Sequence, residues 1–555
     1  MVRATFSGFN TALSALQANQ KRLDITGQNL SNMNTAGYTR QQLEASSLNY
    51  TNPVSHYSNG NETAVGFGVS MERVSQIRDP YLDIQYRSQS ADCSYTNRLQ
   101  TALNSLSKVL DETTISGIRQ AFDDIQSTLT SMQDPAKVSD PIYESELRTK
   151  MQSVCNLFNQ ASRQISQAEQ NEFQRLTGEG SSEQGDVQKI NDILRQIGDL
   201  NVQIKRNQVA GHPSLELQDE RNLLLDELSG YIPVETRYYK DDAHSGNNAY
   251  DYDANGAVIG KKDWPDDLEV SMNYIDAQGK SQKLILVNGS DLGADGLTKN
   301  YGQLSMLKGD HQTAASVSDP ANISIKFEKA PSYQVNGQAA ADVYAELKGI
   351  HFEGGSLQAS LDMLQKKGTG NVINGSVDDV RGYQYYSEKL DQLADTFAKS
   401  MNASNNGNNH KDQNLLSNST DDSTNGITAG NIGISKGWTS GTIHISTDGT
   451  NRTDTILDMI AAMKDTKKLN GKTFADFMNN LSTQLASDSS SNQTALKTGT
   501  TVLNSIQDSR DSLSGVSLDE EATNMMAYVS AYNAASRLMT ALDEVLNTLI
   551  SNTGA

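Results

Sequence analysis

Residues 518–550 read LDEEATNMMAYVSAYNAASRLMTALDEVLNTLI, and apolar side chains recur through this stretch mostly in steps of three and four. An alternation of three and four is the contact stripe of a helix that supercoils against a partner helix. The stripe consists of Leu518, Ala522, Met525, Val529, Tyr532, Met539, Leu546 and Ile550. The sequence therefore predicts a long C-terminal helix whose apolar side requires a partner.

A weaker stripe of the same kind lies near the N-terminus, within residues 1–33. Its apolar members are Phe6, Phe9, Leu13, Leu16, Leu23 and Leu30. Because the coiled-coil signals lie at the two ends of the chain, we expect these ends to pair with each other or with neighbouring subunits. This arrangement is typical of an assembly element rather than of an enzyme.

Neither terminal stripe is expected to fold by itself. Burying the apolar stripe of residues 518–550 would stabilise the helix by about 12–24 kcal/mol. Ordering the same residues costs on the order of 1–2 kcal/mol for each residue, and an isolated helix recovers little of that. We therefore expect both ends to be mobile in the free monomer and to become ordered against each other and against adjacent subunits.

The composition restricts the classes of partner. The 555 residues include 46 Lys and Arg against 67 Asp and Glu, which gives a net charge of −21. This charge opposes binding to nucleic acid and to anionic lipid, because both are polyanions. We expect no membrane insertion and no cleavable signal peptide, since the sequence lacks apolar runs of the required kind. Cys93 and Cys155 are expected to be buried free thiols, with a disulfide as the alternative.

Helical and β-rich segments alternate along the chain, so the expected fold class is α+β with several domains. Both chain ends should build a long α-helical stalk, a coiled coil or bundle, with small antiparallel β domains inserted into it. The expected domains are a terminal coiled coil (1–35 and 516–555), a helical bundle (36–230, 355–403 and 451–515), a β domain (231–354) and a β-rich insert (404–450). Within the last insert, the sequence predicts a strand at Thr442–Ser446.

The sharpest local string follows directly on the N-terminal stripe. Its residues are Asn29, Leu30, Ser31, Asn32, Met33, Asn34, Thr35, Ala36, Gly37 and Tyr38. Asn and Gly tolerate positive φ, so the string predicts a tight turn at the end of the first helix. The string resembles the signature of the bacterial flagellar axial proteins, the family of rod, hook and hook-associated subunits.

Four further blocks are similar to segments of the same family. They are Gly66–Val69 with Arg78–Leu82, the helix Leu215–Ser229, the segment Gly355–Leu361, and Ser514–Ala522. The second and fourth blocks favour the hook-associated members over rod or hook subunits. One departure is visible at Ser404–Gly407, where the family often has a His before the turn.

The resemblance implies a structural subunit that forms a ring of like subunits at the junction between flagellar hook and filament and performs no chemistry. It implies the hook protein on one side, and a second junction protein or the filament on the other. It also implies type III export, aided by a cytoplasmic chaperone, to an extracellular location on the bacterial flagellum. The alternatives are another axial subunit, of hook or rod type, or a surface-displayed module for binding or adhesion carried by the β inserts.

Candidate ligand sites in the sequence are weak. Asp251–Gly256 copies the first half of a calcium-binding loop, but Lys262 stands where that loop needs a bidentate Glu, so a hairpin turn is favoured. The cluster of Tyr383, Tyr385 and Tyr386 predicts helix packing rather than a ligand platform. We therefore expect no catalytic, cofactor-binding or metal-binding residues.

Overall fold

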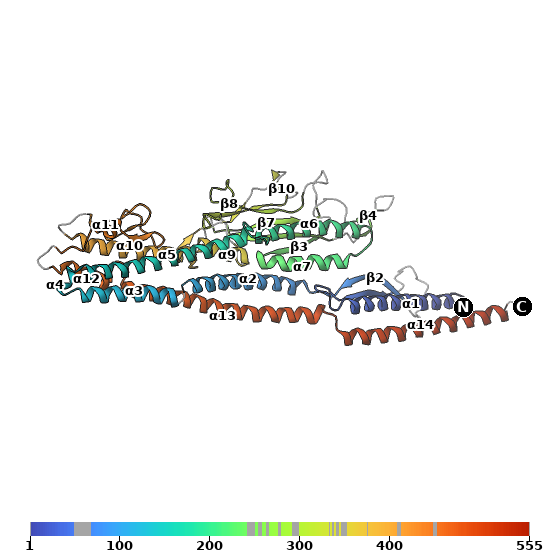
Figure 1. Cartoon of the computed structure of the whole chain (residues 1–555). Coiled ribbons are helices and arrows are strands. Elements are labelled where there is room, and N and C mark those ends of the chain that lie inside the picture. The colour runs from blue at the N-terminus through green and yellow to red at the C-terminus, as the bar shows by residue number, and fades with distance from the viewer. Residues whose placement is uncertain are drawn as a thin grey trace.

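Figure 1 shows a long, narrow molecule in which both chain ends lie at the same extremity. A pair of terminal helices occupies that extremity, a helical body continues from it, and the β-rich segments lie along one side of the body. The computed structural model describes residues 2–48, 68–110, 112–240, 250–252, 258–261, 266–275, 279–290, 299–331, 334–335, 338–339, 343–345, 352–373, 376–407, 412–447 and 452–553.

The longest elements are helices. We call α1 (Val2–Ser31) and α14 (Leu518–Thr553) the terminal pair. The body contains α2 (Pro80–Val109), α3 (Glu112–Ser131), α4 (Pro135–Val138), α5 (Pro141–Thr177), α6 (Asp186–Val209), α7 (Leu215–Tyr231), α9 (Ser356–Gln365), α10 (Tyr383–Asn406), α12 (Asp454–Lys464), the 3-10 turn η1 (Lys467–Leu469) and α13 (Phe474–Ser514). The alternation of long helices with β segments is the α+β class that the sequence predicts.

Three helices of the body begin at an Asp-Pro pair. Asp79, Asp134 and Asp140 each accept a hydrogen bond from the backbone N–H two residues on, at 2.9, 3.0 and 2.9 Å, and these residues cap α2, α4 and α5. Proline fits the next position because an N–H in the first turn has no helical acceptor. The spacing of these caps therefore sets where the body helices begin.

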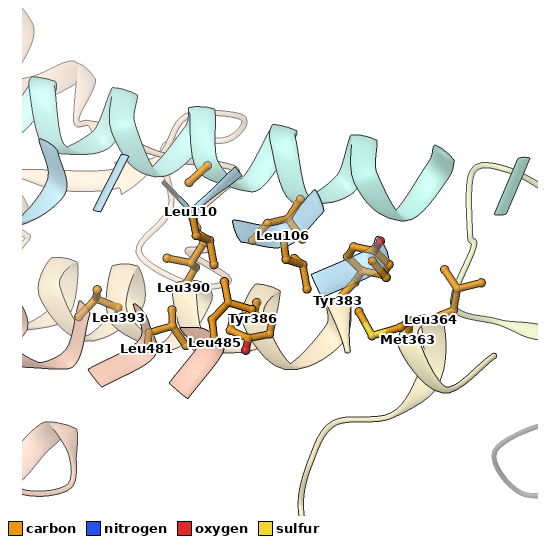
Figure 2. Close-up of a cluster of buried hydrophobic side chains, with 14 of the residues drawn as sticks. Leu106, Leu110, Met363, Leu364, Tyr383, Tyr386, Leu390, Leu393, Leu481 and Leu485 are labelled. Carbon is orange, nitrogen blue, oxygen red and sulfur yellow. The ribbon is translucent and has the colours of Figure 1, made fainter. Parts of the chain in front are cut away.

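The core of the body joins helices that are far apart in the sequence. Figure 2 shows leucines of α2, α10 and α13, with Leu110 directly after α2, in one cluster, and all of them are buried: Leu106, Leu110, Leu390, Leu393, Leu481 and Leu485. Phe122 of α3 extends the core, because its ring contacts those of Phe397 and Phe474 at centroid distances of 5.2 and 5.5 Å. Tyr383 and Tyr386 are also buried in this core, which confirms the predicted helix packing of these two residues (Figure 2).

The segment between α7 and α9 forms small antiparallel sheets, with the strand orders β3-β6-β7 and β12-β9-β8. The strands are β3 (Glu235–Lys240), β4 (Tyr250–Tyr252), β5 (Val258–Lys261), β6 (Asp266–Ile275), β7 (Ser281–Asn288), β8 (Gln303–Lys308), β9 (Ile323–Glu328), β10 (Gln334–Val335), β11 (Gln338–Ala339) and β12 (Val343–Ala345). Helix α6 packs against β6, β7 and β8, so the sheets rest on one side of the body (Figure 1).

The calcium-like string lies between β4 and β5, which pair in antiparallel fashion from Tyr250 opposite Lys261. Its residues 253–256, and Lys262 beyond it, lie outside the described residues. Cys93 and Cys155 are both buried and free, which confirms the expected thiols. Burial raises the pKa of the Cys155 thiol to about 12.

The insert at 404–450 differs from the prediction. Its strands are β15 (Leu416–Asn418) and β16 (Ile432–Ile434), and α11 (Lys436–Ser440) follows them. The predicted strand at Thr442–Ser446 is wrong, because this segment is irregular. The side chain of Asn405 takes the place of a strand partner: its amide donates to the carbonyl of His444 at 3.2 Å and accepts from the N–H of Ser446 at 2.9 Å.

Two hairpins complete the fold. Strands β1 (Gln41–Ser47) and β2 (Val69–Gln76) pair with a bulge at Glu44 and Ala45, and both pack on α1. Strands β13 (Val372–Ile373) and β14 (Ser376–Val377) form a short hairpin between α9 and α10. The β1–β2 hairpin therefore covers one side of α1 and leads the chain from the terminal pair into the body.

Candidate assembly site: the terminal pair and its joint

The two ends of the chain pack against each other, as the terminal stripes predict (Figure 1). The helices are antiparallel: Gly8 lies beside Leu542, and the guanidinium of Arg22 lies 5.6 Å from the ring centroid of Tyr528. A Cβ placed on Gly8 would be 3.4 Å from a methyl group of Leu542, which is ordinary van der Waals contact, so the two helices touch at this level.

Helix α14 turns one side toward α1. The partly or fully buried residues on this side recur mostly in steps of three and four, as in a coiled-coil seam, with a step of seven between Tyr528 and Ala535. They are Glu521, Asn524, Met525, Tyr528, Ala535, Met539, Leu542 and Leu546. Met525, Met539 and Leu546 of the predicted stripe lie on this side, whereas Tyr528, Ala535 and Leu542 were not singled out from the sequence.

Other members of the predicted stripe are exposed in the single chain. Leu518, Val529 and Ile550 expose 52 %, 43 % and 64 % of their surface, and Tyr532 is also exposed. On α1, Phe9, Leu16, Leu23 and Leu30 are partly buried and Leu13 is exposed, while the side chain of Phe6 lies outside the described part. The apolar stripe of α14 is thus broader than the surface that one partner helix covers.

The exposed apolar residues of α14 form two flanks. With 3.6 residues per turn, Leu518 and Val529 project to one side of the α1-facing seam, and Leu538 and Val545 project to the other. Met526 is exposed on the side opposite α1. Helix α14 therefore offers apolar surface in two directions after α1 has bound.

The string from Asn29 to Tyr38 forms a clasp at the end of α1. The side chain of Asn29 is buried; it donates to the carbonyl of Gln41 and accepts from the N–H of Gln41, both at 3.0 Å. Tyr38 donates to the same Asn29 oxygen at 2.9 Å. Gly37 has a φ of 78° and lies beside Leu223 of α7. These contacts fix the angle at which the chain leaves α1 and enters β1.

The remaining polar residues of the string satisfy the end of the helix. Ser31 and Asn32 donate to the carbonyls of Gly27 and Gln28, and Thr35 donates to Asn32. Asn34 is exposed. These side chains add a second donor at the last turn of α1, where the N–H of Asn32 also donates to the carbonyl of Gln28 at 3.1 Å.

Arg40, directly after the string, lies where the terminal pair meets the body. Its N–H donates to the carbonyl of Ser514, the last residue of α13, at 2.9 Å, and its carbonyl accepts from Ile77 at 2.8 Å. Its guanidinium binds Glu520 and Glu521, in the first turn of α14, at 2.7 and 2.8 Å. One residue therefore contacts three crossing segments of the chain.

A second cation, Arg510 of α13, ties three body helices together beside this point. Its guanidinium binds Asp83 of α2 at 3.2 Å and Asp226 of α7 at 2.8 Å, and it lies 4.3 Å from the ring centroid of Tyr86. Arg87 of α2 binds Asp226 from the other side at 2.8 Å. The last turn of α13 is thus held in a charged network.

Asp219 of α7 links this network to the turn before Arg40. Its carboxylate accepts from the N–H of Thr39 at 3.1 Å. Burial raises the pKa of Asp219, and the hydrogen bonds from Thr39 and the charge of Arg78 oppose that rise. Burial lowers the pKa of Arg78, but the hydrogen bond and charge of Asp83 outweigh it, so the net shift is upward. We call this set of residues the joint. Its members are Thr39, Arg40, Arg78, Asp83, Arg87, Asp219, Asp226, Arg510, Glu520 and Glu521.

The sequence of this chain matches the models of three protein families. The model described as the flagellar hook-associated protein FlgK helical domain matches residues 103–416, which is more than half of the chain. The chain belongs to the FlgK family. Two further models match its ends: flagella basal body rod protein at residues 9–39, and the C-terminal model of the flagellar basal body rod FlgEFG proteins at residues 509–552.

Curated relatives agree with this family. The chain is 28 % identical over 568 residues to flagellar hook-associated protein 1 of Bacillus subtilis, and the match covers 99 % of each protein. It is 29 % identical over 230 residues to the protein of that name from Salmonella typhimurium, which covers 41 % of this chain and 38 % of the relative. The flagellar hook junction protein FlgK from Burkholderia pseudomallei matches with 19 % identity and a TM-score of 0.38, over 61 % of this chain and 45 % of that one.

Members of the FlgK family are structural proteins of the bacterial flagellum, not enzymes, and this chain is a flagellar component of that kind. The matched N-terminal model contains the Asn29–Tyr38 clasp, and the matched C-terminal model contains Arg510 and Glu521. No described helix combines the length and hydropathy of a membrane span. Within the described ranges, no group of three or more His, Cys, Asp or Glu is placed to hold a metal.

The joint offers a stability test that is independent of assembly. Replacing Arg510 by Met keeps a long side chain at this position but removes two ion pairs and the contact with Tyr86. We expect the free energy of unfolding of the body to fall by about 2–4 kcal/mol, because buried carboxylates lose a charged donor. Urea unfolding followed by circular dichroism measures this value.

The matched control is Arg195→Met, since Arg195 forms ion pairs on the exposed surface of α6. Its expected loss is below about 0.5 kcal/mol. Equal losses for the two variants would show that the charged network around Arg510 does not stabilise the body.

Proposed function

We propose that this chain is the subunit of the junction between flagellar hook and filament, and that it works there as a homo-oligomeric ring. The name of its relatives and the full-length match to the Bacillus subtilis protein support this role. Its task is mechanical: it joins two different axial lattices, so its chemistry is that of packing surfaces.

The observation that carries this proposal is the apolar surface left on α14. Leu518, Val529, Leu538 and Val545 lie in the terminal pair and yet are exposed in the single chain. Full burial of such a side chain stabilises by roughly 1.5–3 kcal/mol. Neighbouring copies of the terminal pair are the partners that a ring supplies, and each α14 then has a neighbour on either flank.

The partners follow from this place in the flagellum. The hook protein lies on one side of the ring, and a second junction protein or the filament lies on the other. Before assembly the chain is bound by an export chaperone in the cytoplasm, and after export it lies outside the cell. The marginal stability expected of the terminal stripes supports this route, because chain ends that become ordered only in the ring remain unstructured during export.

We propose the domain organisation that the sequence suggests. Residues 1–35 with 516–555 form the inner tube, and residues 36–230, 355–403 and 451–515 form the surrounding helical layer. The inserts at 231–354 and 404–450 face outward. The gap between α13 and α14 at residues 515–517 supports the boundary at the C-terminal end.

The proposed assembly residues are the members of the two terminal stripes, both those that face the partner helix and those left exposed. On α14 they are Leu518, Met525, Val529, Tyr532, Met539, Leu546 and Ile550, and on α1 they are Phe6, Phe9, Leu13, Leu16, Leu23 and Leu30. The string Asn29–Tyr38 supports them by fixing the exit from α1.

Immunogold electron microscopy of intact flagella tests the location. With an epitope tag in the exposed turn at Gly211, we expect gold in one narrow band at the boundary between hook and filament. Label along the whole hook, or in the rod, would instead identify another axial subunit. If flagella isolated from cells that express the tagged gene carried no label, the chain would not be part of the axial structure.

A further inference from the structure

The joint connects two segments that are far apart in sequence. Arg40 lies just after α1, and its carboxylate partners Glu520 and Glu521 begin α14. The antiparallel pair starts at this point and extends outward, through Arg22 beside Tyr528 to Gly8 beside Leu542. A contact at the joint therefore brings the first turn of the pair together before the rest of it forms.

The two carboxylates differ in their surroundings. The Glu521 side chain is 2 % exposed, whereas that of Glu520 is 62 % exposed. A buried carboxylate without a cation carries a large desolvation cost, and an exposed one does not. Arg40 is the cation that the structure places on Glu521, and Arg40 is held in position by its backbone bonds to Ser514 and Ile77.

We propose that Arg40 and Glu521 form a latch that couples the ordering of the two chain ends. When the latch closes, α14 is held beside the end of α1, and the helices pair outward from the joint. Starting a helix pair is costly and extending it is cheaper, so a contact that fixes the first turn raises the population of the whole pair. Arg40 is a positioning residue in this scheme. The inference concerns the free chain, so it holds whether or not the chain occupies the hook–filament junction.

The latch can be tested by measuring how often the two ends are paired. Nitroxide labels on Gln17→Cys and Asn533→Cys report on the pair, because both positions are exposed and lie at matching levels of α1 and α14. Cys93 and Cys155 are buried and stay in place. Pulsed electron–electron double resonance gives the fraction of molecules in which the two labels lie a short distance apart. Trimethylamine N-oxide is added, since it favours burial and populates a marginal pair.

We expect a distinct short-distance population in the parent chain. Arg40→Ala should lower the ratio of paired to unpaired molecules by roughly tenfold or more, because Glu521 is left buried without its cation. The double variant Arg40→Ala with Glu521→Ala should recover part of the paired population, since the unpaired charge is gone. The thermal unfolding transition of the body, followed by circular dichroism, should be unchanged in all three chains.

Arg73→Ala is the matched control. Arg73 binds Glu44 in the same hairpin region, but its side chain is 67 % exposed, so its loss should leave the paired population as it was. The latch is overturned if Arg40→Ala and Arg73→Ala give the same population. It is also overturned by a parent chain with no short-distance population in the osmolyte, or by a double variant without recovery.

Discussion

A chain that lacks residues 1–33 and 518–555 stays folded in its body but no longer joins the flagellum. The buried cluster around Phe122, Phe397 and Phe474 lies within the body and needs neither terminal helix. Helix α1 packs on α14 and on the β1–β2 hairpin, so removing both ends exposes little of the body core. Assembly is lost because the apolar flanks of α14 are removed with the helix.

Two measurements check this result. Circular dichroism and thermal unfolding of the purified truncated chain should match the body of the full-length protein. Sedimentation of sheared flagella, followed by immunoblotting, should show the full-length chain in the pellet and none of the truncated one. Truncated protein in the pellet at the level of the full-length chain would refute the role of the terminal pair.

Replacing Leu518, Met526 and Val529 by Ser should also abolish assembly, while the melting temperature of the monomer stays within about 2 °C. These side chains are exposed in the single chain, so their loss leaves its packing unchanged. In the proposed ring, each replacement would remove an apolar contact with a neighbouring subunit. The sedimentation assay measures assembly, and a thermal scan of the free chain measures stability.

Val209→Ser provides the comparison for that triple variant. Val209 is an exposed apolar residue at the end of α6, away from the terminal pair, and its replacement should leave assembly intact. If the triple variant lowered the melting temperature strongly, these residues would be packed in the free chain. If it assembled normally, the surface of α14 formed by Leu518, Met526 and Val529 would not be an interface.

The sequence predicts the long elements well, since each has a local signal. Helix α14 begins at Leu518, where the predicted apolar stripe begins, and continues to Thr553. The predicted strand at Thr442–Ser446 fails because an alternating pattern says nothing about Asn405, whose side chain binds the same backbone groups. Propensity was overridden there by a contact from a distant helix.

The site was harder to predict than the fold. The stripe of α14 shows which residues are apolar, but it does not show which of them face α1 and which face a neighbour. Leu518 and Val529 belong to the stripe and yet are exposed, whereas Tyr528 faces α1. The joint was not predictable, because Arg40 and Glu521 are 481 positions apart and each resembles an ordinary surface charge in the sequence.

The narrow crossing between terminal pair and body determines how load travels through the subunit. Among the described residues, a pull on α1 or α14 reaches the body through the backbone near Ile77 and Ser514, through the ion pairs around them, and through hydrogen bonds to α7 from Thr39 and Gln76. Contacts to water can replace the ion pairs of the crossing. The crossing can therefore open under torque and form again without damage to the apolar core. In the proposed ring, this crossing would lie between the inner tube and the surrounding helical layer, so the compliance of the shaft would be concentrated in one thin, charged layer.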